Sequence, residues 1–481
     1  MDPDCQRQPA GAHDEKPSRI VLAPNEGLPV SNTGTQATPV TFAGKLQLGW
    51  KRFEKQLVVY NVEARGIQRV EPDERHDLRS LGYTQAAIMW FSINLAANNI
   101  TLGMLGPAVF ALGFGDACLC AILGVLVGPC LTYSRYIMGW WPSKLVVILN
   151  IIVLLGYAMI DCVVAGQILS AVSSNSMSVV VGIIIVAIIA WLITTFGYQV
   201  FHYYERYAWL PQIVVLCILA GVAGPNFNVS SVSHGDAATL AGNRLSFFGL
   251  NLAAAITYSG GAADYFVYYP EHTAGWKIFG VTMIGLMLSF TFAFVLGIGL
   301  ASGMMANAAF CGVIVGLGLV ANLVVPTYSS GIDAQILGRW AAVVPRAIWN
   351  TVGVVIYTVC ALAGRGHLAE IFTNFLALMG YWVSIWVAIV LEEHFVFRRK
   401  TEYNWAVWNE KKKLPIGFAA LIAFLVGWVF AIISMAQVWY IGPIAKLVGE
   451  YGGDMGNYLG FASAAVVYPP LRALELKKFG R

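Results

Sequence analysis

Residues 89–107 read MWFSINLAANNITLGMLGP, an apolar segment with Asn94, Asn98, Asn99 and Thr101 in its interior. A helix of about 20 apolar residues crosses the hydrocarbon core of a bilayer. Polar side chains and unwound backbone are tolerated at that depth only where protein or water covers them, and there they can bind a solute. The segment therefore predicts a membrane helix that is broken near its middle.

A second interruption of this kind occurs at 257–261, with the sequence TYSGG, followed by AADY at 262–265. It falls in the sixth apolar segment of the chain, whereas the first interruption falls in the first. Breaks at positions one and six are typical of a five-plus-five inverted repeat of membrane helices. The alternative is that Gly260 and Gly261 only allow two helices to pack closely.

The rest of the chain supports a membrane fold. Its 481 residues are 58% hydrophobic and 12% charged, about half of the charge found in a soluble protein. We therefore predict an all-α polytopic membrane protein of about twelve transmembrane helices. The expected spans are 85–112, 116–133, 144–172, 178–198, 207–224, 246–264, 278–301, 306–330, 343–363, 367–391, 415–437 and 455–470.

Three parts of the chain are expected to differ in character. Residues 1–83 are polar and rich in Pro, Gly and charge, without the apolar core of a signal peptide, which predicts a largely disordered cytosolic tail. Residues 84–470 form the transmembrane domain, and 471–481 form a cytosolic C-terminal tail.

The distribution of Lys and Arg predicts the orientation. With both termini in the cytosol, the outer connections carry only Arg244, Arg365 and Lys446, and all other Lys and Arg lie inside. This matches the positive-inside rule. The formal net charge of +4 thus reflects topology, and we expect no nucleic-acid partner. A plasma-membrane location is the expectation.

The motifs that would indicate an enzyme are missing. The sequence has no GxxxxGK[ST] phosphate loop, no HExxH and no Cys spacing typical of a metal site. We therefore expect no catalytic site, no metal and no cofactor, and the remaining source of energy for transport is an ion gradient.

The most informative single residue is Asp161, midway along the third span. A carboxylate at that depth is costly and is by default a functional hypothesis. Tyr157 lies one helical turn earlier on the same face, so a flat ring can stack there while its edge bonds the carboxylate. A proton-carrying role is a second interpretation, and a core Asp bonded to a neighbouring helix is the structural alternative.

Other candidates are amides in the first, eighth and tenth spans. Asn94 and Asn98 are four residues apart and predict one polar stripe, with Asn99 beside it. Interhelical hydrogen bonds explain such a stripe equally well. Asn322 precedes Pro326 by one turn, which fits either a solute site or a kink, and Asn374 is similarly ambiguous. Asn228 begins an N-x-S sequon in an outer connection and is a glycosylation candidate.

Six motifs in order resemble the purine-cytosine permeases of the nucleobase–cation symporter group. They are GIQRVEPDERHD (66–77), MWFSINLAANNITLGMLGP (89–107), GYAMIDCVVAGQ (156–167), AADYFVYYP (262–270), VANLVVPTYS (320–329) and NFLALMGYW (374–382). The resemblance implies a leucine-transporter-type fold, two C-terminal helices beyond the repeat, a site between spans 1, 3, 6, 8 and 10, and proton coupling.

Several positions depart from the family pattern. Where similar members have Trp, Asn and Trp, this chain has Tyr157, Asp161 and Tyr258. In span 8, Leu323, Val325 and Pro326 replace a second Asn, a Pro and a substrate-binding Asn, and the connection after Ser302 looks short.

We therefore expect a proton symporter of purine- or cytosine-type bases or a related ring compound. Tyr157 and Tyr258 are the candidates for stacking, Asp161 and Asn322 for hydrogen bonds to the ring edge, and Asn98 and Asn99 for the break in span 1. A transporter of another amide or vitamin-like solute, and a membrane receptor that does not transport, are the alternatives.

Overall fold

The computed structural model describes residues 82–128, 134–174, 176–196, 198–266, 269–270, 273–304, 317–399 and 410–480, together with Gly49, Arg75 and Val407. The predicted tail before Gly82 lies outside the described residues apart from Gly49 and Arg75. The connection between the seventh and eighth spans, 305–316, also lies outside them.

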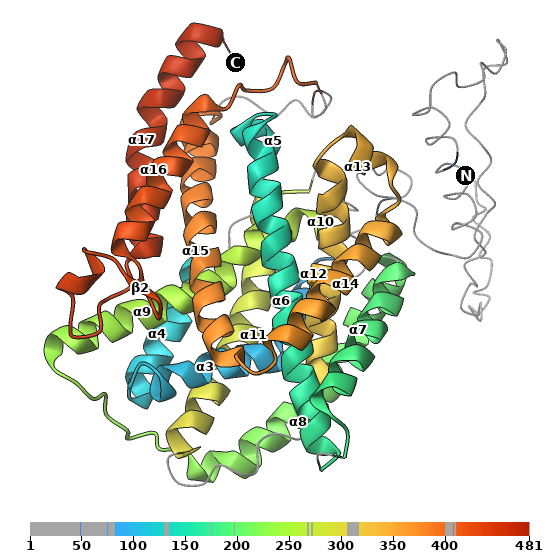
Figure 1. The fold of residues 1–481 in the computed structure, drawn as a ribbon, viewed down its shortest axis with the longest axis vertical. Helices are drawn as coiled ribbons and strands as arrows, with labels where there is room; N and C mark the ends of the chain where they lie inside the picture. The colour runs from blue at the N-terminus through green and yellow to red at the C-terminus, as the bar shows by residue number, and fades with distance from the viewer. Residues whose placement is uncertain are drawn as a thin grey trace, which may run out of the picture. The chain divides into compact units, whose positions relative to one another are not determined.

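The helices and the short hairpin follow the order of the predicted spans (Figure 1). They are α2 (Gly82–Asn94), α3 (Ala97–Ala108), α4 (Phe114–Val127), α5 (Ser134–Met138), α6 (Pro142–Val172), α7 (Val179–Thr195), α8 (Tyr198–Ala223), η2 (Gly224–Asn226), α9 (Ala237–Ile256), η3 (Thr257–Gly260), α10 (Ala262–Phe266), α11 (Gly275–Met304), α12 (Leu317–Ile336), α13 (Arg339–Val343), α14 (Arg346–Gly364), α15 (Leu368–Glu392), η4 (Glu393–Phe397), α16 (Phe418–Ser434), β1 (Ala436–Gln437), β2 (Tyr440–Ile441), η6 (Ala445–Leu447) and α17 (Gly456–Phe479). Each predicted span overlaps a helix or an interrupted pair of helices, and residues 129–133 and 306–316 of two spans lie outside the described residues.

Length and composition agree with a membrane fold. Among the described residues, five helices are long and apolar enough to cross a bilayer, and the bent pair α2–α3 makes a sixth. The helices α4, α7 and α16 are apolar but shorter. Large apolar side chains such as Ile188, Val355 and Val359 lie exposed on helix surfaces, as expected where helices face lipid.

Both predicted interruptions are present. The helices α2 and α3 meet at an angle of 59° across Leu95 and Ala96. In the sixth span, α9 ends at Ile256 and continues through the 3₁₀ turn η3 into α10. The break corrects the predicted polar stripe, because Asn94 and Asn98 lie on different helices. The Asn94 side chain bonds its own helix, at the carbonyl of Trp90 (3.0 Å).

The broken first span packs against α11 through small residues. A Cβ added at Gly103 would lie 2.3 Å from the Phe294 carbonyl oxygen, and one added at Gly297 would lie 2.0 Å from that of Ile100. Only glycine allows the two backbones this approach. The close contact with α11 thus holds α3, and with it Asn98, in place.

The last two helices attach to α15 through a buried ion-pair network. Arg472 of α17 donates to both carboxylate oxygens of Glu393 at 3.0 Å, and Tyr468 donates to the same carboxylate at 2.8 Å. Bidentate pairs of this kind are strong because both charges are hydrogen-bonded. The helices α16 and α17 lie side by side in Figure 1, outside the repeat. The helix α17 continues to Phe479, through most of the segment that we assigned to a C-terminal tail.

Candidate functional site

The unwound segment of the first span is held by amide side chains. Asn322 of α12 donates to the Ile93 carbonyl at 2.8 Å, and Asn99 donates to the Asn94 carbonyl at 2.8 Å. The Asn98 side chain accepts from the backbone N–H of Asn99 at 2.8 Å. The polar residues of the break therefore satisfy the backbone groups that the interruption leaves open.

Three of the predicted site residues converge at this break. The Asn98 amide donates to the Asp161 carboxylate at 2.8 Å and lies 3.2 Å from the Asn322 side-chain oxygen. The three residues come from α3, α6 and α12, and each is at most 3% exposed. Residues from the first, third and eighth spans thus form one polar cluster near the middle of the protein.

The two carboxylate oxygens of Asp161 differ. Oδ1 accepts from Asn98, whereas Oδ2 is buried and has no hydrogen-bond partner among the described residues. An unpaired polar atom in an apolar interior costs free energy, of the order of 1–3 kcal/mol. Oδ2 is therefore the atom in this cluster that is best placed to receive a proton or a donor group of a solute.

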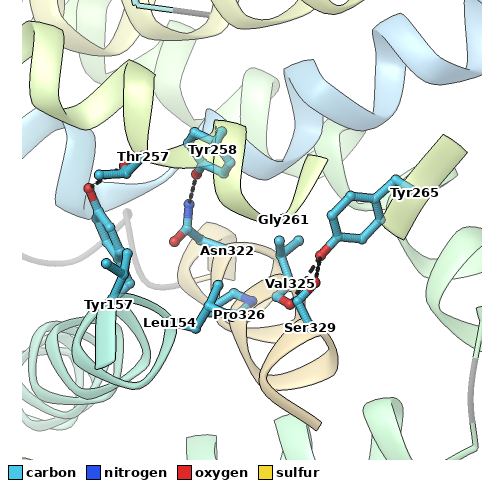
Figure 2. Close-up of a pocket in the computed structure, with 11 residues that line it drawn as sticks. Leu154, Tyr157, Thr257, Tyr258, Gly261, Tyr265, Asn322, Val325, Pro326 and Ser329 are labelled. Atoms are coloured by element: carbon cyan, nitrogen blue, oxygen red, sulfur yellow. Dashed lines mark hydrogen bonds between the residues drawn. The ribbon is translucent and has the colours of Figure 1, made fainter. Parts of the chain in front are cut away.

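A small cavity adjoins the cluster and is shown in Figure 2. Tyr157, Tyr258 and Asn322 line it, together with residues of η3, α10 and α12, and its volume is about 30 Å³. This is of the order of one water molecule. A six-membered ring fits only when the helices around the cavity move apart.

Both predicted stacking tyrosines form part of the cavity wall. The Tyr157 hydroxyl hydrogen-bonds the Thr257 hydroxyl at 3.1 Å, and the Tyr258 hydroxyl lies 3.5 Å from the Asn322 amide (Figure 2). The Tyr157 ring packs edge-on against Phe375, with ring centroids 6.1 Å apart. Both predicted stacking residues therefore reach the cavity with their hydroxyl groups engaged.

The predicted residues occupy different places around this cavity. Asn98 and Asp161 are not among its lining residues: Asn98 contacts the lining residue Asn322, and Asp161 is bonded to Asn98. The Asn99 side chain bonds the backbone at the break. Asn374 lies elsewhere, since its side chain bonds the Glu370 carbonyl and the Val438 N–H. Leu323 is fully buried in the apolar core and does not line the cavity.

Sequence reasoning missed a group of polar residues beside the cavity, on α6, α10 and α12. Ser329 lines the cavity and bonds the Tyr265 hydroxyl at 2.7 Å, and Asn150 donates to the Asp333 carboxylate at 2.6 Å. Ser329 also hydrogen-bonds Asp264. Asp333 was missed because the predicted span ended at 330, whereas α12 continues to Ile336.

Comparisons with known proteins give the family. No protein-family model matches the chain. It is 33% identical to the purine-cytosine permease fcyB of Emericella nidulans over 475 residues, which cover 90% of this chain and 92% of that protein. It is 31% identical to the vitamin B6 transporter TPN1 of Saccharomyces cerevisiae over 520 residues, which cover 89% of this chain and 90% of that protein.

The chain belongs to the purine-cytosine permease family. The purine-cytosine permease FCY2 of Saccharomyces cerevisiae, 30% identical over 96% of this chain and 94% of its own length, agrees with this placement. This chain is therefore a multi-pass membrane transporter, and its relatives are transporters rather than enzymes.

Solved structures confirm the fold of this permease. Mhp1, a nucleobase-cation-symport-1 family transporter, in a closed conformation with bromovinylhydantoin bound, covers 87% of this chain and 96% of its own length, with a TM-score of 0.63 at 13% identity. Mhp1 in an inward-facing conformation gives a TM-score of 0.60 at 11% identity. The predicted leucine-transporter-type fold, with its inverted repeat and two further helices, is thus confirmed.

Proposed function

We propose that this permease is a proton-driven importer of a flat nitrogen heterocycle that carries hydroxyl or N–H donors. The observation that carries the proposal is the buried cluster of Asn98, Asp161 and Asn322 beside a cavity with three tyrosines in its wall. Aromatic side chains offer faces for a ring, and the cluster offers acceptors for the donors at its edge.

Each residue has a distinct role in this proposal. Tyr157 and Tyr258 stack on the two faces of the ring, and Asp161 Oδ2 and the Asn322 amide bond its edge. Asn98 orients Asp161, and Asn99 holds the break. The cavity expands when the two halves of the repeat move relative to each other, which is how alternating access exposes a midplane site.

The relatives supply two classes of substrate, nucleobases and vitamin B6. The site favours the second. Pro326 lines the cavity where the family pattern has a substrate-binding Asn, and it offers no hydrogen to a base edge. Pyridoxine is a pyridine ring with three hydroxyl donors, which suit the Asp161 carboxylate at the ring edge, while its flat ring suits the faces of the two tyrosines. We therefore propose pyridoxine as the first substrate to test, with cytosine and adenine transported weakly.

We further propose that Asp161 carries the coupling proton. Its unpaired oxygen lies in an apolar interior, where a charged carboxylate is disfavoured and where substrate and proton can compete or cooperate for one group. The distribution of Lys and Arg supports both termini in the cytosol, and we propose the plasma membrane as the location. Asn228 is exposed in an outer connection, where an oligosaccharide can attach.

The test is a competition uptake screen in cells that lack their own base and vitamin B6 transporters. Saturable uptake of labelled pyridoxine is expected, with weak competition from cytosine and adenine. High-affinity cytosine uptake, or the absence of saturable uptake of any heterocycle, would overturn the proposal.

A further inference from the structure

A second cavity of about 140 Å³ lies apart from the central one. The end of α3, the middle of α9, the first turns of α15 and the connection between α16 and α17 enclose it. A dry cavity of about 150 Å³ is known to hold one benzene molecule. The second cavity is thus of the size of a single six-membered ring, whereas the central cavity is of the size of a water molecule.

The second cavity lies on the same helix as the central site. Ser246 and Leu250 of α9 line it, and Thr257, which follows α9, lines the central cavity. Leu250 and Thr257 are seven positions apart along the chain, which corresponds to a helical rise of about 10 Å. With the orientation proposed above, α9 begins at the outer surface, so the second cavity lies on the outer side of the central site.

The lining is mostly apolar and carries one carboxylate, that of Asp454. Asp454 lines the cavity and is 9% exposed. Its carboxylate accepts from Tyr381, from the Gln437 amide at 2.9 Å and from the Gly456 N–H at 3.0 Å. All these partners are neutral, so the described residues leave its charge without a cation. Burial raises the pKa of the Asp454 carboxyl to about 6, whereas its hydrogen bonds with Tyr381, Gly456 and Gln437 act in the opposite direction.

Two other features of the cavity would favour a flat ring with hydrogen-bond donors. The cavity is lined by Val109 and Phe110, directly after the C-terminal end of α3, where the helix dipole is negative. The Phe110 ring, 5.6 Å from that of Phe247, offers an aromatic wall. Such a cavity suits a flat ring with N–H or O–H donors, neutral or protonated.

We propose that this outer cavity is a second binding site for the transported heterocycle, occupied on the way to the central site. The proposal rests on the proposed function, because it assumes that a heterocycle is the solute. It assigns Asp454 the role of bonding the donors of the ring, and Ala377 of α15 the role of leaving room for it.

The experiment is equilibrium binding of tritiated pyridoxine to the purified full-length protein in lipid nanodiscs. Two molecules per chain are expected for the unmodified protein, and one for Ala377→Phe, which fills the outer cavity. Asn322→Ala, at the central site, should also leave one. Ala241→Phe is the matched control, because Ala241 is exposed on α9, and it should leave both sites intact.

A second variant keeps the test independent of the folding of Ala377→Phe. Asp454→Asn retains the shape of the side chain and removes its charge. A hydrogen bond to a charged group is roughly twice as strong as one to a neutral group, so the outer affinity should fall about tenfold. One molecule per chain in the unmodified protein, lost in Asn322→Ala and unchanged in Ala377→Phe and Asp454→Asn, would overturn the outer site alone. The absence of binding altogether would overturn the proposed function with it.

Discussion

Asp161 and Asn98 show how one amide can fix one oxygen of a carboxylate and leave the other open. The Asn98 amide binds Oδ1 at 2.8 Å, and Oδ2 has no partner among the described residues. A purely structural Asp would be expected to have both oxygens paired, because unpaired buried polar atoms are rare. The open oxygen is consistent with the role that we propose for Asp161.

Asp161→Ala should reduce pyridoxine uptake roughly 10- to 150-fold, the equivalent of losing a charged hydrogen bond of about 1.5–3 kcal/mol. Asp161→Asn can still accept from Asn98 and should retain transport with altered selectivity. Initial uptake rates, normalised to the amount of protein at the cell surface, measure both effects. Unchanged uptake in both variants would show that Asp161 is structural.

At the scale of the helix, α12 gives different surroundings to three positions that look equivalent in sequence. Pro326 and Val325 line the central cavity, whereas Leu323 is fully buried in the apolar core. The sequence alone predicts all three as altered site positions. Since one turn of helix presents different faces to the cavity and to the core, only Val325 and Pro326 can change the contacts of a solute.

Pro326→Asn should therefore raise cytosine uptake, because it adds an amide to the cavity wall and restores a backbone N–H within the helix. One new hydrogen bond of about 1 kcal/mol corresponds to roughly a fivefold lower KM for cytosine. Leu323→Asn is the control and should lower the amount of folded protein instead, since it buries an unpaired amide. A cytosine KM that stays unchanged in Pro326→Asn would show that position 326 does not set selectivity.

The helices α6 and α15 meet at Gly156. A Cβ at this position would lie 1.9 Å from Cζ of Phe375, the ring that packs against Tyr157. Gly156→Ala should therefore displace Phe375 and Tyr157, at a cost of about 1–3 kcal/mol for overpacking. Uptake should fall, and Phe375→Leu in the same chain should restore part of it.

Gly280→Ala serves as the matched control for this pair, because a Cβ at Gly280 meets nothing within 4 Å. It should leave uptake and the thermal stability of the purified protein unchanged. If Gly156→Ala behaves like Gly280→Ala, the contact between α6 and α15 does not position Tyr157.

At the scale of the whole molecule, the proposal of proton coupling predicts that transport depends on the proton gradient. A protonophore should abolish the accumulation of pyridoxine, and replacement of sodium by choline should have no effect. Asp161→Asn should still exchange substrate across the membrane without accumulating it, because the amide carries no exchangeable charge. Accumulation that requires sodium and survives the protonophore would contradict proton coupling.

Two further buried carboxylates sharpen this test. Asp264 and Asp333 lie close enough to interact electrostatically, and Asn150 binds Asp333. If Asp161→Asn still accumulates substrate in a proton-dependent manner, the proton is carried elsewhere. Asp264→Asn and Asp333→Asn are then the variants to compare by the same measurement.

The sequence by itself determined the membrane class, the order of the helices and both interruptions. Long apolar segments can satisfy their backbone in lipid only as helices, and polar residues inside them are too costly to be accidental. The motifs carried the family, and the relatives confirm it. Asp161 was found in this way, because a single carboxylate in an apolar span is visible without a structure.

Only the tertiary structure decided which polar residues meet. Asn98 and Asp161 are 63 positions apart and Asn98 and Asn322 are 224 apart, and no local pattern predicts such pairs. The break separates Asn94 from Asn98, and the packing of α12 hides Leu323 while it exposes Pro326 to the cavity. The outer cavity likewise exists only because a connection near the C-terminus folds over α3, α9 and α15. Apolar periodicity specifies which segments enter the membrane, whereas side-chain packing between helices specifies which faces surround a solute.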